Sequence, residues 1–236
     1  WHLLYLHSYA RRNQLGRDGA AFAGGVLPKI PMPRRMYAGS TFTFDGDICV
    51  GDKLKRETEF TDIQLRQGST GTLVVATQTR RIFTPRGLAW TEVYSTVFRE
   101  DPKPGETSGT PVREAAPTDV PWRRTIAPDP VMLFRYSAIT FNPHRIHYDR
   151  TYCIETEGYP GLVVHGPFAQ QCIFDLLRDS APGRKVKTIA VRARAPLFDT
   201  STFDVIGRPT ADGKGAELWT VTPKGTIATE ATATFA

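Results

Sequence analysis

The chain has 236 residues and a formal net charge of +6, with 40% hydrophobic and 23% charged residues. This composition is that of an ordinary folded protein and argues against intrinsic disorder. No run approaches the roughly 20 apolar residues that a membrane span needs, and the basic residues are too scattered for a nucleic-acid surface, so neither partner is expected.

The first hundred residues predict a helix followed by strands. Residues 1–15 have apolar side chains at positions 1, 3, 4, 6 and 9 before Gly16, which is typical of a helix and its C-terminal stop. Frequent Gly and Pro in residues 16–39 predict an extended loop. Segments rich in Thr, Val and aromatic residues then predict an antiparallel meander of four strands, at 41–44, 53–65, 72–83 and 88–99.

The middle of the chain predicts a boundary between two domains. Residues 101–123 are rich in Pro and Gly and lack a sustained apolar periodicity, so we expect a linker between domains at 1–100 and 124–236. A short strand is expected at 124–127. A helix at 129–138 would begin with Asp129 as its N-cap and Pro130 in its first turn.

The last part of the chain repeats the order of the first. Residues 167–177 place apolar side chains on one broad helical face. Strands are expected after this helix, at 186–195, 202–208, 217–221 and 226–235. Both halves therefore consist of a helix and then a meander, which indicates a duplication.

Cysteine usage bears on the compartment. Cys49, Cys153 and Cys172 lie far apart without CxxC spacing, which argues against a disulfide framework or a zinc site. We expect a reducing compartment, the cytoplasm, or the mitochondrial matrix if the cell is eukaryotic. Because the chain opens on Trp1 rather than Met, residues upstream are expected, and a targeting segment there stays open.

The chemistry is expected between residues 136 and 166. Three of the five histidines, His144, His147 and His165, lie in or at the end of this segment, and imidazole is suited to moving protons near neutral pH. Pro143 biases Asn142 away from helical geometry, so the first two histidines lie on a braced loop. A purely structural role for His144 or His147 stays open.

Two further features of this segment have alternative interpretations. Gly166 lies at the start of the second helix, where unpaired N–H groups can stabilise the developing charge of a thioester carbonyl. Asp149 either takes part in acid–base chemistry or caps the turn before Tyr152. A metal bound by His144, His147 and Asp149 is disfavoured because zinc sites usually add a distant ligand, so no metal and no cofactor are expected.

The segment carries a recognisable motif, and the whole chain resembles a known family. Its motif is similar to that of the R-specific enoyl-CoA hydratases, also called hydratase 2 or MaoC-like dehydratases. The chain resembles the two-repeat branch, which includes itaconyl-CoA and mesaconyl-C4-CoA hydratases and 3-hydroxyacyl-thioester dehydratase type 2. The matching residues are Asn142-Pro143, His147-Tyr148-Asp149 and the run from Gly161 to Pro167.

The resemblance implies an α+β double hot-dog fold, in which each repeat wraps an antiparallel sheet around a long helix. Those helices correspond to residues 1–15 and 167–177. The N-terminal repeat has neither His nor Asn-Pro at the corresponding stretch, so we expect one active site per chain, in the C-terminal repeat.

The resemblance also implies the reaction, a reversible syn addition of water to the double bond of an enoyl-CoA. A short acyl group is expected, including dicarboxylic ones such as itaconyl-CoA or mesaconyl-C4-CoA. His147 matches the catalytic histidine and the Gly166 N–H matches the donor to the thioester oxygen. The family's catalytic Asp falls on Thr140 here, so the partner of His147 stays open among Asn142, His144, Thr140 and Asp149.

Substrate contacts and partners follow from the same interpretation. The phosphates of coenzyme A suit the basic charge of the chain. An acyl-CoA thioester is the expected ligand, and a homodimer or higher homo-oligomer is open. Candidate substrate contacts are Gly166, His165, Thr140, Arg135 and Arg145, with Arg192 and Arg194 as further candidates for phosphate or carboxylate.

Three other functions remain open from sequence. The first is dehydration of 3-hydroxyacyl thioesters in fatty acid synthesis, which is the reverse reaction on a different carrier. The second is a hot-dog subunit that binds thioesters without catalysis. The third is a thioesterase, because fold does not fix function.

Overall fold

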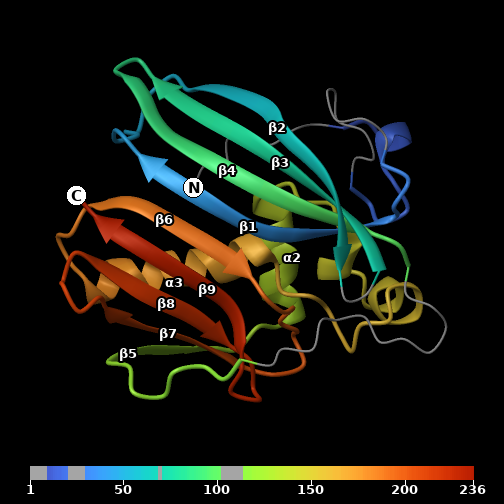
Figure 1. Cartoon of the computed structure of the whole chain (residues 1–236). Helices are drawn as coiled ribbons and strands as arrows, with labels where there is room; N and C mark the ends of the chain where they lie inside the picture. Colours follow the sequence, from blue (N-terminus) through green and yellow to red (C-terminus); the bar gives the residue numbers. More distant parts are fainter. Residues whose placement is uncertain (1–9, 21–29, 69–70, 102–113) are drawn as a thin grey trace.

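A single antiparallel sheet of nine strands organises the part of the chain that the computed structural model describes, residues 10–20, 30–68, 71–101 and 114–236 (Figure 1). The strand order is β2-β3-β4-β1-β6-β9-β8-β7-β5. The strands are β1 (Arg34–Phe44), β2 (Lys55–Gly68), β3 (Gly71–Thr84), β4 (Gly87–Arg99), β5 (Trp122–Ile126), β6 (Val186–Ala193), β7 (Phe203–Pro209), β8 (Gly215–Val221) and β9 (Ile227–Phe235).

The N-terminal half supplies β1 to β4. The predicted strands 53–65, 72–83 and 88–99 are confirmed as the meander β2–β3–β4. The expected loop at 16–39 is wrong at its end, because β1 already begins at Arg34. Gly39 lies at a β-bulge in β1, where an added Cβ would meet the carbonyl oxygen of Val191 at 2.3 Å. This glycine permits two strands to approach closely and does not mark a loop.

The predicted helix at 1–15 can be compared with the structure only in part. Residues 1–9 lie outside the described residues. Residues 10–15 contain only a short 3-10 turn, η1 (Arg12–Gln14), so a continuous helix through position 15 is wrong.

The C-terminal half supplies β5 to β9 and two α-helices, α2 (Pro130–Ile139) and α3 (Gly166–Ser180). The predicted cap of α2 is confirmed, because the Asp129 side chain accepts a hydrogen bond from the Met132 N–H at 2.8 Å. Short helical turns, η2 (Arg145–His147) and the π-helix η3 (Tyr152–Thr156), connect α2 to α3. Strand β5 begins at Trp122, inside the segment expected to be a linker.

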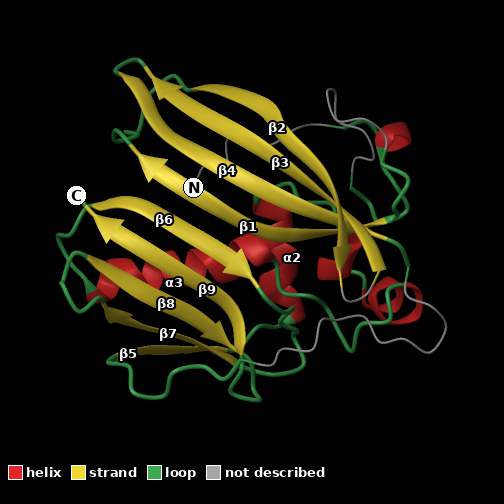
Figure 2. Cartoon of the chain, viewed as in Figure 1, coloured by secondary structure: helices red, strands yellow, loops and turns green. Residues whose placement is uncertain are grey.

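The core forms where α3 packs on the sheet (Figure 2). α3 contacts β5, β7, β8 and β9, and it buries one face with the spacing expected of an amphipathic helix. The buried residues of this helix are Ala169, Gln170, Cys172, Ile173, Leu176 and Leu177. Burial of this face fixes both ends of α3 relative to the sheet.

The two halves join along β1 and β6, which lie side by side in the middle of the sheet (Figure 1). A buried ion pair also connects them, with Arg34 Nε 2.6 Å from Glu157 Oε2. The side chains of Phe42 in β1 and Phe174 in α3 meet edge to face at 5.7 Å. The halves therefore share one core. Within the described residues, no helix is long and apolar enough to cross a membrane.

Candidate active site

Three histidine rings from separate parts of the C-terminal half meet in the interior. His147 and His165 stack with their ring centroids 3.7 Å apart, and the His144 ring meets His147 edge-on at 5.4 Å. His144 is the N-cap residue of the turn η2 and His147 is its last residue, whereas His165 is the N-cap residue of α3. The cluster that the sequence predicted from spacing therefore exists in space.

The end of α2 directs the chain into this cluster. Phe141 N–H donates to Ala138 O, and Asn142 N–H donates to Ser137 O, which together form a Schellman motif. Phe141 has φ +50°, a left-handed conformation that glycine usually supplies. The Asn142 side-chain oxygen then accepts the His144 N–H at 3.1 Å. Asn142 thus shapes the loop that carries the histidines.

His147 is held in one tautomer. Its Nδ1 lies 2.7 Å from the carbonyl oxygen of Val163, and because a carbonyl only accepts, Nδ1 carries the proton. Nε2 is then the atom with a lone pair. Burial, with a smaller effect of His144, lowers the pKa of His147 to about 3. His147 is therefore a neutral base near pH 7.

His144 lies between positive and negative groups. Its Nε2 is 3.7 Å from Asp18 Oδ2, in a turn of the N-terminal half. Burial comes first and the charge of Arg35 second among the causes that lower the pKa of His144 to about 3. His144 is thus also neutral at pH 7, despite the nearby carboxylate.

His165 is fully buried. Its Nε2 lies 2.8 Å from the Ser137 hydroxyl of α2, while its Nδ1 has no hydrogen-bond partner among the described residues. Burial and then His147 hold the pKa of His165 far below its usual range. A buried ring nitrogen without a hydrogen-bond partner is unusual in a folded protein.

Gly166 begins α3 against an aromatic ring of the other half. A Cβ at this position would meet Cδ1 of Tyr37 at 2.4 Å, so only glycine fits. The Tyr37 hydroxyl donates to Gln170 Oε1 at 2.6 Å, one turn further along α3. This contact keeps the Gly166 N–H at a fixed place beside His165. Pro167 has no N–H, and the N–H groups of Phe168 and Ala169 both donate to His165 O at 3.0 Å, so Gly166 is the donor that the first turn can offer.

The other predicted site residues have structural contacts. Asp149 accepts the Tyr152 N–H at 3.0 Å and pairs with Arg145 at 2.8 Å, so it caps the following turn. Arg145 also lies over the Tyr152 ring. The Thr140 hydroxyl donates to Tyr136 O at 2.6 Å.

The remaining arginines lie further out. Arg135 is exposed on α2. Arg192 and Arg194 both approach Glu230, at 3.9 and 2.7 Å. The structure thus brings the histidines, Asn142 and Gly166 together, whereas Asp149 and these arginines have contacts of their own or face solvent.

Sequence reasoning missed the contribution of the N-terminal half. Asp18, Arg35 and Tyr37 lie against the histidine loop or the start of α3. The sequence carries a turn signal at Asp18-Gly19, but nothing local connects that turn to histidines far along the chain. Their proximity is a product of tertiary folding.

A cysteine nucleophile and a metal site find less support in the structure. The Cys153 thiol is buried and lies 2.9 Å from Gly161 O, and burial raises its pKa to about 11, so it packs in the interior as a neutral thiol. Among the described residues, no group of three or more His, Cys, Asp or Glu side chains is arranged to hold a metal.

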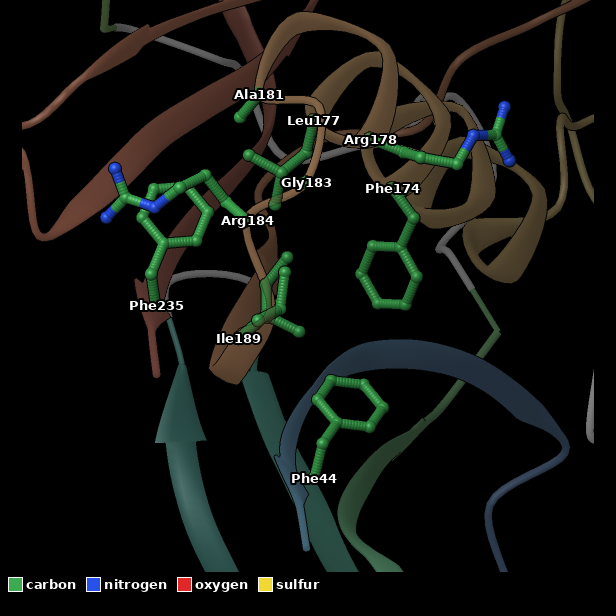
Figure 3. A pocket seen from close by; sticks show the side chains of 10 residues that line it. Phe44, Phe174, Leu177, Arg178, Ala181, Gly183, Arg184, Ile189 and Phe235 are labelled. Carbon is green, nitrogen blue, oxygen red and sulfur yellow. The ribbon is translucent and has the colours of Figure 1, made fainter. Parts of the chain in front are cut away.

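An apolar cavity of about 210 Å³ lies at the other end of α3 (Figure 3). Phe44 and Phe174 face each other across it, and the guanidinium groups of Arg178 and Arg184 lie at its outer sides. None of its lining residues is a histidine or a carboxylate. The histidines suited to acid–base chemistry cluster instead at the N-terminal end of the helix, roughly 20 Å away at 1.5 Å per residue.

Comparison with solved structures identifies the fold. A MaoC-like dehydratase from Phytophthora capsici matches with a TM-score of 0.67 at 15% identity, over 89% of this chain and 74% of that one. A Mycobacterium tuberculosis protein with a double hotdog fold matches with a TM-score of 0.52 at 13% identity, over 85% and 75%. These likenesses confirm the predicted α+β double hot-dog fold.

Sequence comparison then gives the family. The family model for hydroxyacyl-thioester dehydratase type 2 matches residues 1–199. Mesaconyl-C(4)-CoA hydratase of Chloroflexus aurantiacus is 39% identical over 237 residues, spanning 98% of this chain and 81% of the relative. The chain belongs to the hydroxyacyl-thioester dehydratase type 2 family, and it is a hydro-lyase.

Proposed function

We propose that this protein reversibly adds water to the double bond of a short enoyl-CoA, with mesaconyl-C4-CoA as the first candidate. The observation that carries the proposal is His147, a buried neutral imidazole whose Nδ1 proton is engaged by Val163 and whose Nε2 is available as a base. The 39% identical relative is named mesaconyl-C(4)-CoA hydratase, which supports the acyl group.

The chemical steps use groups that lie together. His147 Nε2 removes a proton from water as the oxygen bonds to the β-carbon, and the π electrons move to the thioester oxygen. The Gly166 N–H at the start of α3 stabilises the enolate oxygen. The imidazolium then returns its proton to the α-carbon, so one water is added and His147 is regenerated.

His144 and Asn142 are the groups proposed to orient the water. His144 reaches the edge of the His147 ring, and Asn142 holds the backbone of His144. Both side chains are neutral and carry hydrogen-bond donors and acceptors, so they can hold a water molecule in one orientation. His165 Nδ1 is proposed to contact the thioester.

Proposals on partners and location follow from the substrate. Coenzyme A phosphates suit a chain with a net charge of +6, and exposed Arg135 is a candidate contact. A homodimer or higher homo-oligomer is proposed without a specific interface. The cytoplasm, or the mitochondrial matrix in a eukaryotic cell, is the proposed compartment.

The test is loss of enoyl-thioester absorbance over a panel of acyl-CoA substrates. We expect wild-type activity, and a fall in kcat/KM of about 10²- to 10⁴-fold in His147→Ala. His147→Gln is the matched variant, because its amide can still donate a hydrogen bond but cannot act as the base. Folding of each variant is checked by thermal melting. Lack of wild-type activity on every enoyl-CoA contradicts the proposal.

The family description favours one alternative, the dehydration of a 3-hydroxyacyl thioester. The same residues serve both directions, so rates on CoA-linked and carrier-linked substrates separate the two. A non-catalytic subunit would show no effect of His147→Ala on any residual activity. A thioesterase would release free thiol from acyl-CoA.

A further inference from the structure

Asp18 is a buried carboxylate in the N-terminal half, with only 2% of its surface exposed. Its Oδ2 accepts from Arg35 Nε at 2.9 Å, and its Oδ1 accepts from Arg35 Nη2 at 3.3 Å and from the Ala20 N–H at 3.1 Å. These contacts hold the carboxylate in one orientation.

The turn that carries Asp18 is docked on the histidine loop. The Arg145 N–H donates to Asp18 O at 2.8 Å, and Arg145 Nη1 donates to Arg17 O at 3.1 Å. Gly19 has φ +82°, and a Cβ there would meet Pro143 O at 2.2 Å. Close backbone contact on both sides therefore fixes Asp18 relative to His144.

The carboxylate faces one edge of the His144 ring. Asp18 Oδ2 lies 3.7 Å from His144 Nε2, a distance that a small rotation closes to a hydrogen bond. A carboxylate only accepts, so it favours the tautomer with the proton on Nε2 and leaves a lone pair on Nδ1. The other charged or titratable groups near His144 are Arg34, Arg35, His147 and His165.

We propose that Asp18 is a positioning residue of the hydration reaction, and that it acts through His144. By holding Nε2–H, it fixes the tautomer and angle of a ring that orients the attacking water beside His147. A carboxylate of the site is thereby supplied by the N-terminal half of the chain. This inference rests on the proposed function.

The test is a kinetic double-mutant cycle with Asp18→Asn, His144→Gln and the double variant. We expect Asp18→Asn to lower kcat at least tenfold while KM stays within about twofold. In the His144→Gln background the same change should alter kcat by less than twofold. Additive effects, or an unchanged kcat in Asp18→Asn, overturn the inference.

Two further variants distinguish a positioning role of Asp18 from a role in folding. Glu92→Gln is the matched control, since Glu92 is also a buried carboxylate, 3.1 Å from an arginine, Arg80, but belongs to β4. It should leave kcat unchanged. Asp18→Glu keeps the charge beside Arg35 and shifts the carboxylate, so it should fold and still lose kcat; full kcat in this variant overturns the inference.

NMR spectroscopy reports the tautomer of the His144 ring directly. In ¹⁵N-labelled protein, wild-type His144 should show a protonated Nε2, and Asp18→Asn should shift the ring nitrogens towards a mixed tautomer. An unchanged His144 signal contradicts the inference. If wild type is active and His147→Ala is not, a null result at Asp18 removes this inference alone. An inactive wild type removes the proposed function first.

Discussion

The two halves of the sheet are both antiparallel, but they contribute unequally to the candidate site. The C-terminal half holds α3 and the three clustered histidines, whereas the described N-terminal half contains no histidine. Even so, Asp18 reaches His144 and Tyr37 covers Gly166. The described N-terminal residues therefore still line the candidate site, and variants in either half can test how the two halves share it.

The largest expected effect is on pH dependence of stability, and it belongs to the C-terminal half. The pKa values of His144 and His147 are lowered to about 3, and that of His165 is lowered further, all chiefly by burial. Below pH 6.5 the unfolded chain binds protons that the folded chain does not. The stability from these histidines is therefore fully present above pH 6.5 and is lost as the pH is lowered below it.

Below that pH, each such histidine lowers the free energy of unfolding by about 1.4 kcal/mol per pH unit, and the three together lower it by about 4 kcal/mol per pH unit. Denaturant unfolding between pH 5 and 8 measures this slope. His144→Gln should reduce it by about a third. A free energy of unfolding that does not change between pH 6.5 and 5 would show that the histidines are protonated in the folded state.

The next largest effect is on stability, and it concerns the buried ion pair between the two halves. Glu157→Gln removes the carboxylate that faces buried Arg34 and that also accepts from the Tyr152 hydroxyl. Breaking a buried pair from one side costs about 3–5 kcal/mol. Glu217→Gln is the control, because its pair with Arg208 is exposed and should cost less than about 1 kcal/mol. Equal losses in the two variants would mean that the buried pair does not hold the halves together.

A smaller effect tests the contact of Tyr37 with α3. Gly166→Ala places a methyl group into the Tyr37 ring, which should cost about 1–3 kcal/mol and lower kcat by moving the first N–H of the helix. Gly46→Ala is the control, since its Cβ would meet nothing closer than 3.5 Å. Adding Tyr37→Ala to Gly166→Ala should restore part of the stability, and a strictly additive loss would refute the contact.

The smallest effect is local to the C-terminal half. Phe141 occupies the left-handed position of the Schellman motif, so Phe141→Gly should be more stable than Phe141→Ala by about 1 kcal/mol. Both variants lose the same ring, and thermal melting compares them. Equal melting temperatures would argue that this position is not strained.

Prediction from sequence succeeded where the signal is local. Asp129 and Pro130 mark the start of α2, and the apolar spacing of 167–177 marks α3, because capping and one-sided burial are written into neighbouring residues. It failed at residues 34–39, where Gly39 suggested a loop but serves the close approach of β1 to β6. A local pattern cannot distinguish these two uses of glycine.

The candidate site shows the same contrast between local signals, which the sequence carries, and long-range contacts, which it does not. The spacing of His144, His147 and His165 predicted a candidate site, and the three rings meet in space. The sequence also left Asp149 open between catalysis and capping, and its hydrogen bond to Tyr152 N–H is that of a cap. The histidine tautomers and the lowered pKa values could not be predicted from the sequence, because they depend on burial and on partners distant in the chain.

The chain by itself determined the histidine segment, its helix start and the strands, since each depends on residues a few positions apart. Only the tertiary structure decided what completes the site. Asp18 meets His144 because the turn around Gly19 packs on Pro143, and Tyr37 meets Gly166 because β1 pairs with β6 beside α3. Such contacts arise from long-range packing, which no local pattern encodes.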